Sequence, residues 1–498
     1  MMTVRMTTRT LLATCAMTTW AIPAAAQQAA SPTPSRQAAN ADGGNSTQSD
    51  DIVVTAQSRS ERLQDVPIQV TALTAQRIED AGVKSTADAL SQVANVTFDQ
   101  GNTYRSAFIT MRGLTQINNA DPPVAFVIDG VPQTNQETVG ISLFDIERIE
   151  VLKGPQGSLY GRNAEGGAIN VITRQPTNEF KGFGAFTYAS GNDVQASAGL
   201  SGPIAKDTLL FRVAGSYRSA DGLISNSFTN KKVDYIDHDW SVRGQLVFTP
   251  TSALKVDLRG QYNDFSGGSN YYSTVFSANP NDFVGPQGNF PSFSSGYVTD
   301  LTGKIDLDLG FATLTSITGY TSLKQTARAD LDFRNPVRSP TGIFGLGFQA
   351  GQGQDLRLKT FSQELRLVSA GEGPFRWLIG GYYLNTDRDL RNRAFVDLTS
   401  DPNQINIPAL VFADQNGSQR NKAYAVFGQA DYDILTDVTL TGGLRYDDDH
   451  REQTDVSTGG KRKASFDKVQ PKATLTWRIT PRQLVYATFR AFSDHAGS

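Results

Sequence analysis

Apolar and polar residues alternate in one run after another over the second part of the chain, from residue 178 to residue 498. A period of two predicts β-strands that have one apolar face. Each run is about long enough for a tilted strand to cross a bilayer. A count of the runs from Lys181 onward predicts about thirteen strands. One run has its apolar face at Leu254, Val256, Leu258, Gly260 and Tyr262.

The connections between these runs favour a membrane barrel over a soluble β-sandwich, which shows the same alternation. Short turns, for example near 202–204, 309–311 and 434–436, alternate with long polar stretches. Outer-membrane barrels have short periplasmic turns, long external loops and aromatic residues at both interfaces. The long stretches are 220–237, 267–298, 327–354, 390–420 and 449–464. Aromatic residues near the run ends include Tyr217, Phe248, Tyr262, Tyr383 and Trp477.

Residues 60–175 have a mixed α and β pattern instead. Thr74 can cap a short helix that ends at Gly82, and Ser85 with Asp88 forms a capping box for a second helix. Asp129-Gly130 lies between two apolar runs and predicts a tight hairpin. Strands are expected at 66–73, 108–112, 124–129, 146–152 and 168–173. The pattern predicts a small, compact α+β domain.

The N-terminus has the three parts of a secretory signal peptide in the right order. Arg5 and Arg9 form a basic region, a short apolar stretch follows, and Ala24-Ala25-Ala26 supplies small residues for cleavage. We therefore expect residues 1–26 to be removed, although a buried N-terminal helix is the alternative. Residues 27–50 are rich in Ala, Gln, Ser and Pro, so they are expected to form a flexible linker.

Composition and charge exclude several classes of protein. Beyond the leader, no stretch of about 18 apolar residues exists, so no transmembrane helix is predicted. The mean hydropathy of -0.33 is compatible with barrel strands, in which only alternate residues are apolar. The net charge of -3 argues against nucleic acid as a partner. The single cysteine, Cys15, lies in the leader, so the mature chain has no thiol chemistry.

A short β-prone run lies just after the linker, with polar residues on both sides. It comprises Asp51, Ile52, Val53, Val54, Thr55 and Ala56. The run has no obvious partner within its own segment. It is therefore a candidate for pairing with the sheet edge of another protein.

This run, together with Leu63–Ile68, resembles the TonB box and plug entry of TonB-dependent outer-membrane receptors. Residues 123–132 resemble the central hairpin of the plug, and residues 145–173 resemble its most distinctive stretch. The runs at 361–367 and 444–447 are similar to strand signatures of the barrel. The resemblance implies a TonB box at 51–57, a plug at 60–175 and a partial transmembrane β-barrel at 178–498.

The resemblance also implies a function and its partners. A scarce ligand binds outside, the TonB box then becomes available in the periplasm, and the inner-membrane TonB complex pulls on it. The family's commonest ligands are iron–siderophore complexes, which are our default. The alternatives are uptake of a carbohydrate or an aromatic nutrient, or a passive porin-like or adhesin-like barrel. Three aromatic residues of the long loop 267–298 could stack on a planar ligand, or they could pack the loop on itself. They are Tyr271, Tyr272 and Phe276.

No motif in the chain predicts catalysis, a cofactor or a metal site. Gly154–Ser158 lacks the Gly-Lys-Ser/Thr ending of a phosphate loop, so we expect a turn with special backbone angles. The spacing of His238, His450 and His495 fits no metal motif and favours exposed loop histidines. The acidic run 447–449 is expected to be solvated. An enzyme would lack both a nucleophile and a base.

The strand count further predicts that this chain alone does not close a barrel. Bacterial single-chain barrels have an even number of strands, and the resemblance implies about twenty-two, so roughly nine are missing. An open edge in lipid costs several kcal/mol for each unpaired backbone group. Residues 491–498 also depart from the strand pattern. We expect no heat-modifiable migration from this chain alone, and a compact, protease-resistant species in outer membranes would contradict this.

Overall fold

The computed structural model describes residues 52–490 apart from 56–58, 60, 84, 102, 141–142, 270–278, 280, 283, 343–344, 346, 372 and 481–482. The predicted leader, the linker and the two ends of the predicted TonB box, Asp51 and Ala56, therefore lie outside the described residues. The candidate ligand residues Tyr271, Tyr272 and Phe276 lie outside them too. Within the described ranges, no helix is long and apolar enough to span a membrane.

The first domain, the plug, is built on a five-stranded sheet with the order β3-β8-β9-β6-β7. Its strands are β3 (Gln69–Thr74), β6 (Val124–Ile128), β7 (Val131–Gln133), β8 (Ile146–Lys153) and β9 (Gly167–Thr173). Only the pair β6–β9 is parallel among these neighbours. Two hairpins flank the sheet: β1 (Val53–Val54) with β2 (Glu61–Arg62), and β4 (Val96–Gln100) with β5 (Ala107–Met111). The helices are η1 (Leu63–Asp65), α1 (Ala75–Asp80), α2 (Thr86–Ser91), η2 (Gln136–Thr138) and α3 (Gly157–Tyr160).

Local sequence signals fix several of these elements, as predicted. The Thr74 side chain accepts a hydrogen bond from the Arg77 amide at the start of α1. Ser85 and Asp88 form both hydrogen bonds of the capping box that begins α2. Asp129 and Gly130 have φ angles of 50° and 89°, which suit the tight turn between β6 and β7. Sequence patterns did not predict β4, η2 or α3, because these short elements depend on packing against the rest of the plug.

Both faces of the plug sheet are covered. On one face the helices and the β4–β5 hairpin enclose a cluster that includes Leu90, Met111, Phe126, Ile149 and Ile169. On the other face a smaller cluster includes Val54, Val66, Ile68, Leu152 and Ala168. The second cluster contains Val54, a residue of the predicted TonB box.

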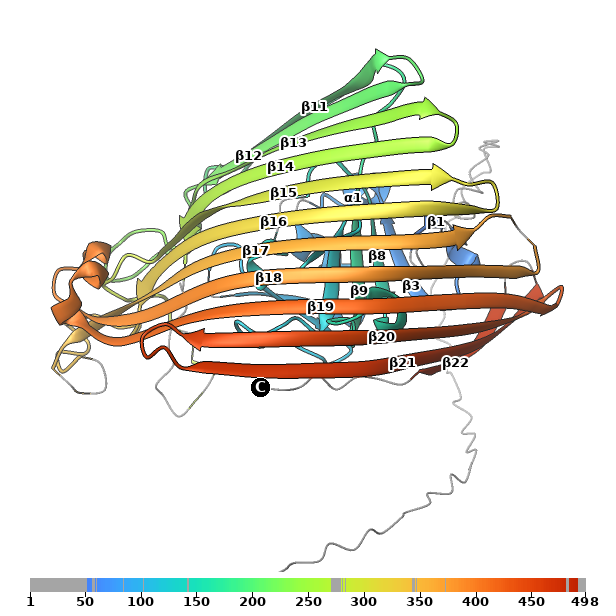
Figure 1. The fold of residues 1–498 in the computed structure, drawn as a ribbon. Helices are drawn as coiled ribbons and strands as arrows, with labels where there is room; N and C mark the ends of the chain where they lie inside the picture. The colour runs from blue at the N-terminus through green and yellow to red at the C-terminus, as the bar shows by residue number, and fades with distance from the viewer. Residues whose placement is uncertain are drawn as a thin grey trace, which may run out of the picture. The chain divides into compact units, whose positions relative to one another are not determined.

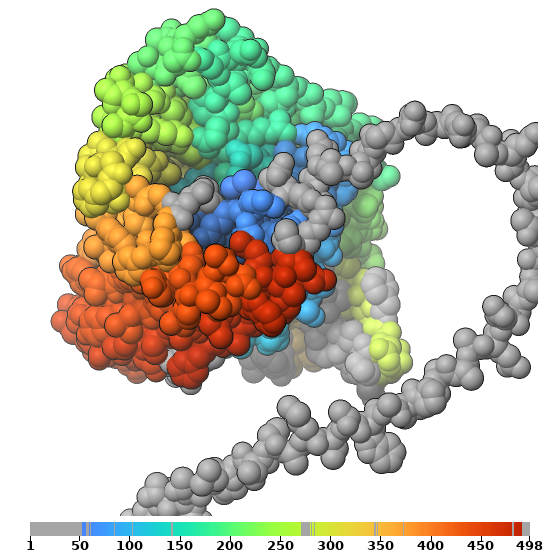
Figure 2. Space-filling view, turned by 90° about the vertical axis from the view of Figure 1, so that its right-hand side faces the viewer, coloured from blue at the N-terminus to red at the C-terminus, as the bar shows by residue number. Residues whose placement is uncertain are grey.

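The second domain is a 13-stranded antiparallel sheet in which the strands follow one another in sequence order from β10 to β22. In Figures 1 and 2 this wall curves around the plug, and in Figure 2 the plug atoms (blue) lie between its green and red ends. The two edge strands, β10 and β22, are not paired with each other in the described sheet. The predicted mainly β fold, with an α+β plug and an open barrel wall, is confirmed. The strands are β10 (Lys181–Ala189), β11 (Asp193–Ala205), β12 (Leu209–Ala220), β13 (Ile236–Thr251), β14 (Leu254–Gly268), β15 (Phe293–Asp308), β16 (Ala312–Asp330), β17 (Gln349–Ser369), β18 (Phe375–Asp397), β19 (Val411–Leu435), β20 (Val438–Asp455), β21 (Lys461–Thr480) and β22 (Gln483–Arg490).

The two faces of the wall differ as the alternation predicts. Large apolar residues such as Leu258, Leu301 and Ile379 remain exposed on the outer face. Polar residues of the same strands, such as Asp257, are buried on the inner face. Aromatic rings of neighbouring strands form rows on the outer face, for example Trp240, Tyr262 and Tyr297, and Phe361, Tyr383 and Tyr424. These rows have the placement of an interfacial girdle.

The long connections are shorter than the sequence predicts. The expected loop 390–420 is replaced by paired strand up to Asp397 and again from Val411, with only η4 (Pro402–Asn406) and η5 (Pro408–Leu410) in between. Likewise, strand replaces most of the expected loop 449–464. Backbone pairing continues where both faces are polar, because it does not require apolar side chains. Ion pairs across strands support it, such as Arg391–Asp414 at 2.6 Å.

Polar side chains of the plug and the wall meet in buried ion pairs. Asp129 of the plug contacts Arg259 of β14 at 2.5 Å, and Asp145 accepts a hydrogen bond from Nε of Arg212 of β12 at 2.7 Å. The expectation that the acidic run 447–449 is solvated is wrong. Asp447 and Asp449 are buried on the inner face, where Asp449 contacts Arg162 of the plug at 3.3 Å. An inner face filled by a plug leaves such carboxylates no bulk water, so they take arginine partners.

The close approach of β8 to β9 gives a test of the plug packing. Gly167 has a φ of 150°, and an added Cβ would lie 2.2 Å from the Leu152 carbonyl oxygen and 2.4 Å from the Met111 sulfur. We expect Gly167→Ala to destabilise the plug by about 1–3 kcal/mol, since overpacking forces neighbours apart. The rate at which a protease cuts within the plug, residues 60–175, measures this. Gly244→Ala is the matched control, because its Cβ meets nothing within 4 Å. Equal resistance of the two variants would contradict this packing.

Candidate functional site

The described part of the predicted TonB box, Ile52–Thr55, is here called the box segment. Contrary to expectation, it has a partner within its own chain, because Val53 and Val54 pair with Arg62 and Glu61. The Leu63 amide donates to the Ile52 carbonyl at 2.8 Å. In an antiparallel ladder alternate residues point their amides to opposite sides, which directs the Val53 amide away from β2. No described strand other than β2 pairs with β1, so the Val53 amide faces an unpaired edge, on which Glu150 binds the Thr55 amide.

Apolar packing holds the box segment against the plug. The Val54 side chain is 0% exposed and belongs to the cluster with Val66, Ile68 and Leu152. The neighbouring Val53 side chain points outward and is 46% exposed. Release of the segment from the plug therefore requires Val54 to leave an apolar cluster, at a cost of roughly 1.5–3 kcal/mol.

A buried carboxylate fastens the end of the box segment. Glu150 of β8, which is fully buried, accepts a hydrogen bond from the Thr55 amide at 2.9 Å and contacts the Thr55 hydroxyl at 3.3 Å. Arg148 compensates the charge with a 2.8 Å contact, and Asn170 of β9 donates to the same Thr55 hydroxyl at 3.3 Å. We call this group, Thr55 with Arg148, Glu150 and Asn170, the box latch.

The residues after the box segment are attached to the wall instead. Arg59 contacts Asp431 of β19 at 2.6 Å, and Asp65 contacts Arg478 of β21 at 3.0 Å. Burial, followed by the charge of Asp431, raises the pKa of Glu61 above its ordinary value. Asp431 and Arg478 lie near the short turns of the wall, which identifies this end as the one that faces the periplasm in outer-membrane barrels.

A cavity of about 390 Å³ lies at the opposite end of the plug, here called the apical pocket. The plug contributes its floor through Thr103, Asn118, Asn119, Gln136 and Glu137. Strands β16 to β19 form its sides, close to the long connections 331–348 and 398–410. The wall residues are Ala327, Ala329, Leu331, Gln352, Gly353, Gln354, Asn392, Arg393, Ala394, Ala413 and Gln415.

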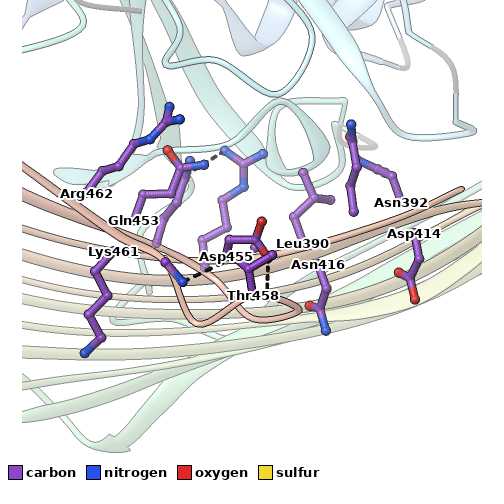
Figure 3. A pocket seen from close by; sticks show the side chains of 14 residues that line it. Leu390, Asn392, Asp414, Asn416, Gln453, Asp455, Thr458, Lys461 and Arg462 are labelled. Atoms are coloured by element: carbon purple, nitrogen blue, oxygen red, sulfur yellow. Dashed lines mark hydrogen bonds between the residues drawn. The ribbon is translucent and has the colours of Figure 1, made fainter.

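A second cavity of about 550 Å³ adjoins the first and shares Asn392 and Gln415 with it. We call it the hairpin pocket, because the β20–β21 hairpin forms one side. Figure 3 shows Asn392, Leu390, Gln453 and Arg462 projecting to one side of the wall, whereas Lys461, Asp414 and Asn416 project to the other. The first group faces the plug, so the two cavities together form one open site above it.

The floor of the apical pocket contains a buried acid, Glu137, which is 1% exposed. Its Oε2 accepts hydrogen bonds from the Thr103 hydroxyl at 2.7 Å and from Gln325 Nε2 at 2.6 Å. Burial raises the pKa of Glu137, and these hydrogen bonds offset the rise only in part. Gln136 and Ser106 are further hydrogen-bond partners of the Glu137 carboxylate. Oδ1 of Asn119 is a buried acceptor without a hydrogen-bond partner among the described residues.

Hydrogen bonds tie this floor to three neighbouring strands of the wall. Gln325 of β16 reaches Glu137, and Asn119 Nδ2 donates to Gln354 of β17 at 3.3 Å. Arg388 of β18 donates to the Asn119 carbonyl at 2.8 Å. A ligand that displaces Asn119 or Glu137 would therefore disturb contacts between the plug and the wall.

The sequence predicted one part of this site and missed the other. The box segment came from its β-prone pattern, but the pocket residues lie in irregular segments of the plug and at polar strand ends, which carry no pattern. Of the aromatic residues in the long loop, Phe290 is buried and packs against Phe395 with ring centroids 5.6 Å apart. Phe290 thus joins the loop to β18 instead of packing the loop on itself, and the stacking role of Tyr271, Tyr272 and Phe276 stays a prediction.

The sequence also singled out three histidines and a glycine-rich turn, of which His495 lies outside the described residues. His238 and His450 lie in strands β13 and β20, not in loops, and contact Asp264 and Asp448 at 2.8 and 3.1 Å. No cluster of metal-binding side chains occurs among the described residues. Gly154 has a φ of 92° and adopts the predicted special backbone angle.

Two family models match the chain. The model for the TonB-dependent receptor plug domain matches residues 62–168, and the model for the TonB-dependent receptor-like β-barrel matches residues 175–493. Together they cover the plug and the wall described above.

Individual relatives are more distant. The pesticin receptor of Yersinia pestis is 23% identical in an alignment 459 residues long, which covers 87% of this chain and 62% of the relative. The crystal structure of the ferric yersiniabactin uptake receptor FyuA from Yersinia pestis aligns with a TM-score of 0.70 at 18% identity, over 85% of this chain and 64% of that one. The crystal structure of the siderophore receptor PiuA from Acinetobacter baumannii aligns with a TM-score of 0.69 at 17% identity. The alignment covers 89% of this chain and 66% of that one. This chain thus spans less than two thirds of the Yersinia receptor.

The box latch gives a prediction about access to the box segment. Glu150→Ala removes the acceptor of the box latch. It should weaken docking of the box segment on the plug by about 2 kcal/mol, or roughly 30-fold in the docking equilibrium. A cysteine introduced as Val54→Cys reports on this docking, because the side chain at position 54 is buried while the segment is docked. We expect a thiol reagent to label this cysteine slowly with Glu150 present and many times faster in the double variant.

Val53→Cys is the matched control, since the Val53 side chain is exposed beside the buried one. It should be labelled quickly with or without Glu150. Unchanged labelling at residue 54 after loss of Glu150 would show that the latch does not hold the segment.

Proposed function

The chain belongs to the TonB-dependent receptors, and we propose that it takes up a ferric siderophore across the outer membrane with energy from TonB. FyuA and PiuA, which have this fold, are described as receptors for such ligands. Family members are transport receptors rather than enzymes. Accordingly, we assign the pocket residues to ligand binding and no residue to catalysis.

One observation carries the proposal: a single plug sheet connects the pocket floor to the box latch. Glu150 lies in β8 and Asn170 in β9, and β9 pairs with β6, which pairs with β7. The chain continues from β7 directly into Gln136 and Glu137 of the floor. A passive pore needs neither a plug in its lumen nor such a connection. The arrangement suits a receptor that couples an occupied pocket to release of the box segment.

We assign TonB binding to Asp51, Ile52, Val53, Val54, Thr55 and Ala56. The outward edge of Val53 supports the assignment, because strand addition uses free amides and carbonyls. Binding through the backbone would carry a pulling load without a specific side-chain match. We further propose export by the signal peptide at residues 1–26 and a location in the outer membrane of a Gram-negative cell.

Uptake in iron-starved cells tests this function. Cells that express the receptor should accumulate radiolabelled iron from a ferric siderophore, and a protonophore should abolish accumulation without abolishing surface binding. Uptake that persists after collapse of the proton-motive force would identify a passive channel instead.

Within this function, Val53→Pro should abolish uptake and leave ligand binding intact. Proline removes the Val53 amide, which points to the open edge and is not needed for pairing with β2. Val53→Ala keeps the amide and is the matched control, for which we expect normal uptake. Normal uptake by a correctly exported Val53→Pro receptor would refute strand addition at this edge.

A further inference from the structure

Three basic side chains lie together on the outer face of the wall. Lys324 of β16 and Arg357 of β17 are directly opposite each other in the antiparallel ladder, and Lys359 follows Arg357 by two residues on the same face. All three are exposed, whereas the intervening Leu358 and the preceding Leu356 are buried on the inner face. We call Lys324, Arg357 and Lys359 the basic triad. Figure 1 shows β16 and β17 in the middle of the wall, where each is paired on both sides.

The members of the basic triad repel one another. Side chains directly opposite each other in an antiparallel pair have Cβ atoms about 5 Å apart, and like charges at such positions are destabilising. None of the three forms an ion pair among the described residues. Other exposed cations of the outer face have acidic partners, for example Lys463 with Glu452 at 3.2 Å. The triad is therefore a cluster of like charges whose counter-charge is not supplied by the described wall.

The acids near the basic triad do not neutralise it. Asp355 of β17 is engaged by arginines of β16 and β18, at 2.9 and 2.6 Å. Asp387 of β18 is engaged by Arg420 at 3.4 Å. Asp389, which is opposite Arg357 on β18, is the remaining acid beside the triad. Three cations thus face one free carboxylate, and the surface keeps a surplus of positive charge.

The basic triad lies beside the aromatic rows of the outer face, on the side of the long connections. Tyr297, a ring of one row, is directly opposite Lys324. Phe361, a ring of the other row, follows Lys359 by two residues, or about 7 Å, toward the short turn after β17. Such rings lie at the level of the lipid head groups. The triad is therefore at the headgroup level of the outer leaflet.

We propose that the basic triad binds the phosphate groups of lipid A in the outer leaflet of the outer membrane. Lipid A carries phosphates on its sugar headgroup, and a phosphate accepts hydrogen bonds from arginine and lysine at once. A phosphate between Lys324 and Arg357 converts their mutual repulsion into attraction to a shared anion. The inference rests on the proposed location in the outer membrane and does not depend on which ligand the receptor takes up.

Binding of purified lipid A to the receptor in a non-ionic detergent tests the proposal, with dephosphorylated lipid A as the comparison. Native mass spectrometry counts the bound lipid as its concentration is raised. We expect lipid A to bind at least about tenfold more tightly, because each basic residue near an anionic lipid contributes about fivefold. Equal affinity for the two lipids would overturn the phosphate contact. The assay contains no ferric siderophore, so that result would leave the proposed function intact.

Two variants locate the binding in the basic triad. Arg357→Gln removes the central cation and should weaken lipid A binding about fivefold, without effect on the dephosphorylated lipid. Lys422→Gln is the matched control, because Lys422 of β19 is an exposed cation outside the triad, opposite Asn385 and His450. It should leave lipid A binding nearly unchanged. Equal losses in the two variants would show a general attraction of lipid to basic residues and would overturn the triad as the site.

Thermal unfolding separates lost lipid binding from a folding defect. Without lipid, Arg357→Gln should melt at the same temperature as the native receptor or higher, because the substitution relieves the repulsion with Lys324. Added lipid A should raise the melting temperature of the native receptor more than that of the variant, since a ligand stabilises the state that binds it. An equal rise in both proteins would overturn the role of Arg357.

Discussion

Backbone hydrogen bonding is the constraint on which the rest of this structure depends. Lipid offers no partner to an amide or a carbonyl, so a chain that crosses it as strands must pair each strand with its neighbours. Strands β10 to β22 do this in sequence order, by antiparallel pairing throughout. The pairing fixes which side chains point outward and which point inward. The outer face can then be apolar, but the inner face needs polar partners.

The plug supplies many of those partners. Asp129 and Asp145 engage arginines of β14 and β12, and Arg162 engages a carboxylate of β20. A buried charge is tolerated only when it is paired, so these contacts hold the plug in one position.

The functional elements lie at opposite ends of this plug and share its sheet. The floor of the apical pocket follows β7, and the box latch lies on β8 and β9. The box segment is docked by one buried valine and one buried carboxylate, which makes its attachment weak enough to be reversed. Glu137 and Asn119 connect the ligand side to three wall strands through single hydrogen bonds. Small changes at the floor can therefore alter contacts over much of the plug.

The sequence by itself determined the division into plug and wall, the number of strands in the wall, the caps of α1 and α2 and the turn at Asp129-Gly130. Each of these depends on residues that are neighbours in the chain, so local periodicity and turn chemistry reveal it. The sequence also marked Ile52–Thr55 as β-prone. It did not show that Val54 is buried or that β2 pairs with this segment. Tertiary structure alone decided the pocket and the latch. Gln354 of the wall meets Asn119 only because the plug lies inside the wall, whereas Thr55 meets Glu150 through the fold of the plug itself. The same placement buries Asp447 and Asp449, because an acidic run that looks solvated in the sequence faces a filled lumen in the fold.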